Sequence, residues 1–189
     1  MTRGTLSSLH HAPALLPFDR SSIDVATVFR EHGAFVHRIL RRLGVHPADV
    51  DDALQEVFVV VHRRLPEFDR DASMRPWVYG ISVRVASRAR RRRWSSREVG
   101  AEEAPEPIDP TTPLDSVAAK QASEVLSVIL DQIDDEKRAV YVLHELEELS
   151  VPEVAKVLGC PVQTAYSRLR AAQVAVADAV RRYRLREGI

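Results

Sequence analysis

The chain has 189 residues, of which 45% are hydrophobic and 29% are charged, a balance typical of a globular protein. Its 27 basic and 27 acidic residues cancel to a formal net charge of zero, which by itself argues against a nucleic-acid-binding protein. A single cysteine, Cys160, excludes an intrachain disulfide framework and a cysteine-based zinc site. No apolar run approaches the ~20 residues that a membrane helix needs, so we expect a cytoplasmic protein that does not insert into a membrane.

The neutral total hides an uneven distribution of charge along the chain. Residues 24–94 contain 14 arginines against nine acidic residues, and residues 168–189 contain six arginines against two acids. Between them, residues 95–119 have one base against six acids, and residues 120–167 have four bases against nine acids. Basic segments of this kind often bind a polyanion. The 24 arginines against three lysines also fit the codon bias of a GC-rich genome, and both interpretations stay open.

The first half of the chain predicts three helices after a flexible extension over residues 1–21. Apolar residues at three- or four-residue spacing indicate each helix. The predicted helices cover residues 25–43, 47–65 and 73–93. Gly44 can end the first helix, Pro47 suits the first turn of the second, and Pro66 follows the last residue of the second. We expect these helices to form one module over residues 22–95.

A proline-rich acidic segment divides the chain. Four prolines fall between residues 105 and 113 without apolar periodicity, so residues 96–112 are predicted to form an extended linker. Residues 113–189 are predicted to form a second module. Its four helices start near Leu114, after Asp134, after Ser150 and near Val162. The sequence therefore predicts an all-α protein of two small helical domains joined by an acidic linker.

The last two helices predict a helix-turn-helix. Residues 150–153, Ser-Val-Pro-Glu, match a capping box with proline in the first turn, and Gly159 ends the short helix that follows. The second helix of such a motif places its N-terminal half in the major groove of DNA. The side chains that it would present are Gln163, Thr164, Tyr166, Ser167, Arg168 and Arg170.

The helix over residues 73–93 ends in a run of arginines, and no acidic residue lies between Arg84 and Arg97. On a helical projection Trp77, Arg84, Arg88 and Arg91 fall within roughly 60° of one another, beside the apolar stripe. An aromatic side chain followed by arginines suits base stacking and phosphate contact on single-stranded nucleic acid. A solvated helix end, with Trp77 in the core, is the alternative.

The helix over residues 47–65 begins with an acidic, polar edge. Carboxylates there complement the helix dipole, which explains them without a partner. A surface for a basic protein is the alternative. The edge consists of Asp49, Asp51, Asp52, Gln55 and Glu56.

Motifs for catalysis are missing from the sequence. It has no glycine-rich phosphate loop, no G-x-S-x-G and no H-E-x-x-H, and no glutamate has a histidine three residues later. We therefore expect no enzyme, no catalytic residue, no metal site and no cofactor.

Taken together, these segments resemble the bacterial RNA polymerase sigma factors of the sigma-seventy family. Residues 51–58 are similar to their D-A-x-Q-E-x-F segment, and residues 75–81 to their R-T-W-L-Y-x-I segment with its basic tail. Residues 149–162 resemble their L-S-x-x-E-I-A…L-G opening of the helix-turn-helix, which residues 167–169 close as S-R-L. With two modules, the chain resembles the extracytoplasmic-function group. It departs from the common pattern at Arg84, Tyr166 and Ala171.

The resemblance implies a role for each surface. Residues 22–95 would be sigma region 2 and residues 113–189 sigma region 4. Binding of the polymerase β′ coiled coil would fall to Asp51, Asp52, Gln55, Glu56 and Phe58. Melting and holding of the −10 element would fall to Trp77, Tyr79, Arg84, Arg88, Arg91 and Arg92. The predicted helix-turn-helix residues would read the −35 element.

The implied partners are core RNA polymerase, through its β′ and β subunits, promoter DNA, and an anti-sigma factor. The alternative is a stand-alone helix-turn-helix regulator whose first module senses a ligand. Such regulators usually dimerise to match paired half-sites, and the acidic linker and the arginine run have no role in one.

Overall fold

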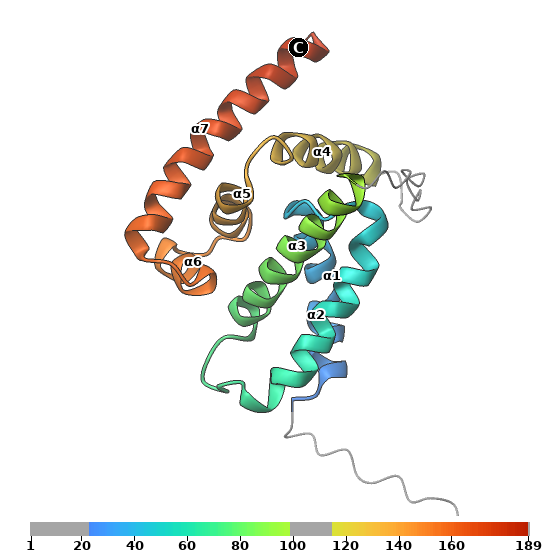
Figure 1. Cartoon of the computed structure of the whole chain (residues 1–189), viewed down its shortest axis with the longest axis vertical. Helices are drawn as coiled ribbons and strands as arrows, with labels where there is room; N and C mark the ends of the chain where they lie inside the picture. Colours follow the sequence, from blue (N-terminus) through green and yellow to red (C-terminus); the bar gives the residue numbers. More distant parts are fainter. Residues whose placement is uncertain (1–22, 99–114, 189) are drawn as a thin grey trace, which may run out of the picture.

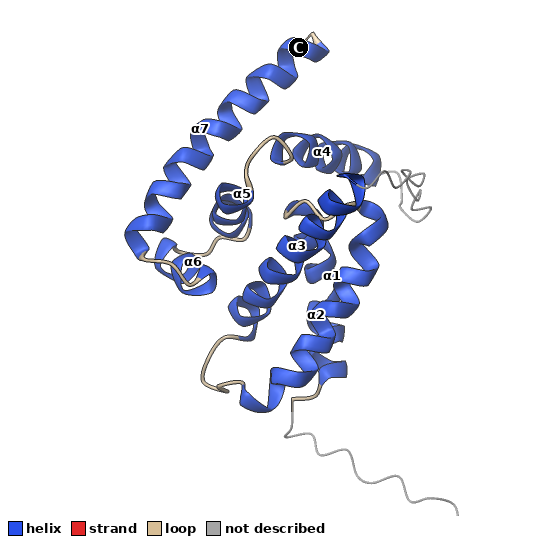
Figure 2. Ribbon diagram, viewed as in Figure 1, coloured by secondary structure: helices blue, strands red, loops and turns tan. Residues whose placement is uncertain are grey.

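The computed structural model describes residues 23–98 and 115–188, and the regular structure in these two ranges is entirely helical (Figure 2). The predicted all-α class is therefore confirmed. The predicted extension over residues 1–21 and most of the predicted linker, residues 99–112, lie outside the described residues. None of the described helices is long and apolar enough to cross a lipid bilayer.

Seven α-helices follow one another in the described ranges. They are α1 (Val25–Arg42), α2 (Val50–Arg64), α3 (Met74–Glu98), α4 (Asp115–Leu130), α5 (Asp135–Tyr141), α6 (Val151–Leu158) and α7 (Val162–Glu187). Short 3₁₀ turns over Pro47–Asp49 and Leu65–Glu67 flank α2. The helix predicted after Asp134 differs from expectation, because it changes to π geometry over Val142–Leu146.

Local polar residues and glycines set the ends of these helices. Asp24 and Asp134 each accept a hydrogen bond from the backbone N–H three residues later, at 2.7 and 3.0 Å, and so cap α1 and α5. Gly44 and Gly159 follow α1 and α6 with φ of +81° and +65°. Glycine adopts this left-handed conformation without steric cost, which is why both helices end there.

The two halves of the chain pack against each other. Helices α1, α2 and α3 form the first half, while α7 packs along α5 and α6 in the second (Figure 1). Helix α6 also packs on α3, and α4 lies against α1. The buried residues of both halves therefore join in one continuous hydrophobic core. The C-terminal part of α7 projects away from this body (Figure 1).

Candidate nucleic-acid interface

The acidic edge of α2 is largely at the surface. Its predicted polymerase-binding residues are Asp51, Asp52, Gln55, Glu56 and Phe58. Of these, the two aspartates and Gln55 are exposed and Glu56 is half-buried, whereas Phe58 is buried in the core. The edge therefore presents polar groups to solvent, and Phe58 packs in the core beneath them.

An aromatic side chain on α1 extends this surface. The ring of Phe29 meets the ring of Phe58 edge-on, with the centroids 4.8 Å apart, and Phe29 remains 50% exposed. Val59, one helical turn after Gln55, is also exposed. Sequence reasoning missed Phe29 as a surface residue, because its position fits the apolar spacing of α1 and only the packing shows that it faces outward.

The arginine run of α3 divides into two sets. The exposed arginines are Arg84, Arg88, Arg91 and Arg92. Glu56 of α2 lies 3.4 Å from Arg88 and 3.0 Å from Arg92, so it bridges the acidic edge and the basic helix. These arginines thus share one outer face with a carboxylate predicted to bind polymerase.

Two further arginines of the run turn toward the protein. Arg90 Nη1 lies 2.6 Å from a carboxylate oxygen of Asp135 and donates to the carbonyl of Leu43 at 3.3 Å. Arg93 pairs with Asp49 at 3.2 Å. The sequence run R-R-R-R therefore contains both structural arginines and arginines that face solvent, a distinction that helical periodicity alone left open.

The two aromatic residues predicted to contact the −10 element differ in burial. Trp77 is half-buried and packs against Phe68, with ring centroids 4.9 Å apart. Tyr79 is fully buried, and its hydroxyl donates to the Glu147 carboxylate at 2.6 Å. Burial, together with this hydrogen bond, raises the pKa of Tyr79 above its ordinary value. In this arrangement the Tyr79 side chain is shielded from solvent.

Helices α6 and α7 form the predicted helix-turn-helix. The Glu153 carboxylate accepts hydrogen bonds from the Ser150 N–H at 2.8 Å and from the Ser150 hydroxyl at 2.6 Å, which fixes the start of α6. These bonds lower the pKa of Glu153. The buried Ala165 and Leu169 anchor the beginning of α7. Its outer side chains are therefore held on a rigid element.

The predicted −35 residues lie along the first turns of α7. Gln163, Tyr166, Ser167 and Arg170 are exposed, whereas Thr164 and Arg168 are half-buried. The Arg168 guanidinium is 2.7 Å from the Glu136 carboxylate of α5. Arg170 thus faces solvent, and Arg168 is oriented by an acidic neighbour.

Within residues 23–98 and 115–188, no group of three or more His, Cys, Asp or Glu side chains is arranged to hold a metal ion. What the described surfaces offer instead is exposed arginine on α3, a polar and basic helix face on α7, and carboxylates on α2. Exposed arginines and a helix-turn-helix with a polar and basic helix face are typical of a helical DNA-binding protein.

Comparison with known families identifies the class. The chain matches the family models Sigma-70 region 2 over residues 28–96 and Sigma-70, region 4 over residues 123–173. It is 30% identical over 146 residues to the ECF RNA polymerase sigma-E factor of Escherichia coli (strain K12), which covers 72% of this chain and 76% of the relative. The chain therefore belongs to the RNA polymerase sigma factors, and within them to the extracytoplasmic-function (ECF) group.

Other comparisons agree with this assignment. The chain is 27% identical over 150 residues to the RNA polymerase sigma factor NccH of Alcaligenes xylosoxydans, covering 76% of this chain and 80% of that protein. The structure of CnrH in complex with the cytosolic domain of CnrY has the same fold, with a TM-score of 0.61 and 24% identity over 82% of this chain and 86% of that one. The stand-alone regulator is not favoured. Sigma factors in general are not enzymes.

Proposed function

We propose that this sigma factor binds core RNA polymerase through the edge of α2, holds the melted −10 element on the outer face of α3, and reads the −35 element with the start of α7. The observation that carries this assignment is the division of the arginines, because Arg84, Arg88, Arg91 and Arg92 face outward together on one helix. Exposed arginines contact phosphates and stack on unpaired bases. In this proposal, residues 22–95 are the domain that binds polymerase and the −10 element, and residues 113–189 are the domain that binds the −35 element.

The same reasoning gives the protein's setting. We infer a cytoplasmic protein without catalytic residues or cofactor, whose chemistry is supplied by the polymerase. An anti-sigma factor is a further inferred partner. It is supported by the fold shared with CnrH in its complex with the cytosolic domain of CnrY. RpoE from Bartonella quintana, in its complex with the anti-sigma factor NepR, also shares the fold, with a TM-score of 0.59, 19% identity and coverage of 81% of this chain and 96% of that one.

Transcription with core polymerase tests the proposal. Purified chain and core enzyme are incubated with a library of promoter fragments from the source genome, and specific transcripts are sequenced. We expect a defined set of start sites that is absent without the chain. Failure to initiate on any fragment contradicts the proposal.

A matched pair of variants tests the docking edge. Asp52→Arg places a like charge against a basic partner, whereas Glu67→Arg makes the same charge change at an exposed site outside the edge. We expect Asp52→Arg to abolish co-purification with core polymerase and Glu67→Arg to retain it. Equal retention by both variants removes Asp52 from the interface.

A further inference from the structure

One tyrosine of the chain lies at the surface, whereas the other three are wholly or partly inside. Tyr79 is fully buried, and Tyr141 and Tyr183 are half-buried. Tyr166 is 51% exposed. Among the described residues, its ring has no aromatic partner and its hydroxyl has no hydrogen bond. The proposed function assigns Tyr166 to the −35 surface but does not say what this side chain recognises there.

The first turns of α7 hold Tyr166 in a fixed position. Its neighbour Ala165 is fully buried, and Leu169, three residues later, is 6% exposed. Side chains three and four residues apart are neighbours on the surface of a helix, so Gln163 and Arg170 lie beside Tyr166. All three line a groove along the outer side of α7. An amide, an aromatic ring and a guanidinium therefore lie together on the part of a helix-turn-helix that contacts base edges.

The remaining polar side chains of this segment are bound to the protein itself. The Ser167 hydroxyl donates to the carbonyl of Thr164 at 2.9 Å, and Thr164 is half-buried. The Arg168 guanidinium lies 2.7 Å from the Glu136 carboxylate. Among residues 163–170, the exposed side chains without such a bond to the described chain are therefore Gln163, Tyr166 and Arg170.

These three side chains recognise different groups in the major groove. A glutamine amide pairs with the N6 and N7 atoms of adenine, and an arginine pairs with O6 and N7 of guanine. A tyrosine ring has no such pair of hydrogen-bonding groups. Its apolar face instead matches the 5-methyl group of thymine, which apolar side chains contact in this groove. Val162, one turn before Tyr166 and 43% exposed, adds to the apolar surface.

We propose that Tyr166 recognises a thymine in the −35 element by packing its ring against the 5-methyl group of that base. This inference rests on the proposed function of α7 and adds a base identity to it. Tyr166 precedes Arg170 by four residues, which is about 6 Å along a helix axis. Successive bases of a DNA strand are about 3.4 Å apart. The thymine is therefore expected within about two base pairs of the pair that Arg170 contacts.

Selection from random DNA identifies the thymines to be tested. Duplexes with randomised positions are enriched by the full chain, once alone at low salt and once in complex with core polymerase. Each thymine of the enriched motif is then replaced by deoxyuridine, which removes the methyl group and keeps the hydrogen-bonding groups. For the parent chain we expect one position at which this replacement weakens binding about fourfold, the effect of one buried methyl group. An absent motif, or a motif without a methyl-sensitive thymine, overturns the proposal.

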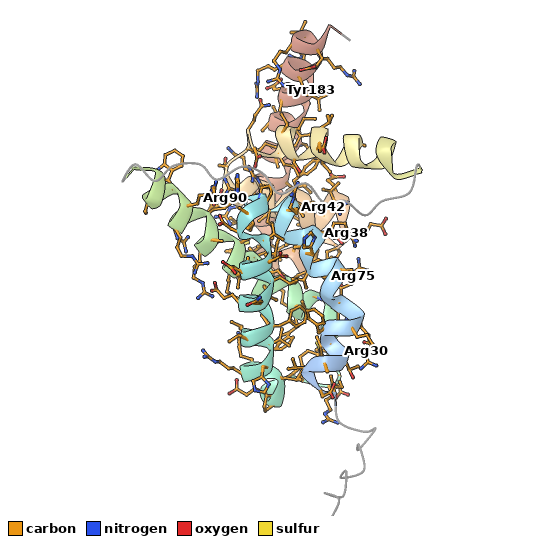
Figure 3. The ribbon with its side chains drawn as sticks, turned by 90° about the vertical axis from the view of Figure 1, so that its right-hand side faces the viewer. Arg30, Arg38, Arg42, Arg75, Arg90 and Tyr183 are labelled. Atoms are coloured by element: carbon orange, nitrogen blue, oxygen red, sulfur yellow. The ribbon has the colours of Figure 1, made fainter. Side chains whose placement is uncertain are left out.

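Substitutions at Tyr166 test whether its ring is responsible. Tyr166→Ala should bind the thymine and deoxyuridine duplexes equally, whereas Tyr166→Phe keeps the ring and should keep the preference of about fourfold. Tyr183→Ala makes the same change near the far end of α7, where Figure 3 shows Tyr183, and should also keep the preference. Circular dichroism establishes that each variant is folded. Because the measured quantity is a ratio of two affinities of one variant, a loss of stability alone does not change it.

The other outcomes at Tyr166 count against the proposal. A preference for thymine that survives Tyr166→Ala assigns the methyl contact to another side chain. A preference that Tyr166→Phe also loses assigns it to the hydroxyl group. Transcription by the parent chain with core polymerase separates the two proposals. Its failure counts against the proposed function, whereas specific transcription from promoters without a methyl-sensitive thymine counts against this inference alone.

Discussion

The two basic segments of this sigma factor have different surroundings. Arginines of α3 lie close to acidic groups of other helices, as in the pairs of Arg92 with Glu56 and Arg90 with Asp135. At the start of α7, Arg168 is paired with Glu136 of α5, whereas Arg170 and its polar neighbours Gln163, Tyr166 and Ser167 are exposed. Equal signs of charge along the sequence therefore do not imply equal availability. Some arginines of α3 stabilise the fold through ion pairs, whereas Arg170 of α7 is free of that role and available for binding.

Gly44→Ala is predicted to have the largest effect, because Gly44 lies beside Arg138 and beside Arg90 of α3. The added methyl group would collide with Arg138 next to Arg90, and alanine is strained at φ of +81°. We expect a loss of about 2–4 kcal/mol in the free energy of unfolding, measured by urea denaturation. Gly188→Ala, at a positive φ with open space around it, is the control and should lose about 1 kcal/mol. Equal losses would show that the contact with Arg138 adds nothing.

Arg170→Ala tests the exposed face at the start of α7. If Arg170 contacts a base, promoter binding by the polymerase–sigma complex should weaken by ~1–3 kcal/mol for a promoter with its −35 element and little for one without it. Arg181→Ala, also exposed on α7 but about three turns after Arg170, is the control. Binding is measured by filter retention at several salt concentrations. An equal loss on both promoters, with a salt slope reduced by about one, indicates a phosphate contact instead.

Arg90→Ala and Arg91→Ala separate inward from outward arginines within α3. Arg90→Ala loses the pair with Asp135 and the bond to Leu43, so we expect a loss of about 1–2 kcal/mol in the free energy of unfolding. Arg91→Ala, at an exposed site, should change that free energy by about 0.5 kcal/mol or less but weaken binding to single-stranded DNA. A stable Arg90→Ala protein would remove the distinction between the two sets.

Ser150→Ala tests the start of the helix-turn-helix and has the smallest expected effect. Loss of this cap should cost about 1 kcal/mol of stability. The pKa of Glu153 is lower in the folded chain than its ordinary 4.5, so its contribution is present above that pH and is lost as pH falls through the folded pKa. The difference in thermal stability between Ser150→Ala and the parent should therefore shrink as the pH falls below 4.5 and through the lower folded pKa. A difference independent of pH contradicts the role of Glu153.

Much of the local structure could be predicted because its causes lie a few residues apart. The helix start at Asp134, the stop at Gly159 and the all-α class are all confirmed. The assignment to the sigma factors is confirmed as well. The individual polymerase and DNA contacts stay predictions, because no contact within the chain tests them.

The sequence by itself determined the helices and the family, since apolar spacing, capping residues and glycine conformation act over one or two helical turns. Only the tertiary structure decided which charged residues face solvent. In the sequence, Glu147 is one acid among several in an acidic segment, and nothing around Tyr79 predicts that its side chain is fully buried. Their bond joins residues 68 positions apart, and that pairing depends on how the two halves pack. Some of the charges that cancel in the zero net total are also paired in space, because arginines of the first half form ion pairs with acidic side chains of the second.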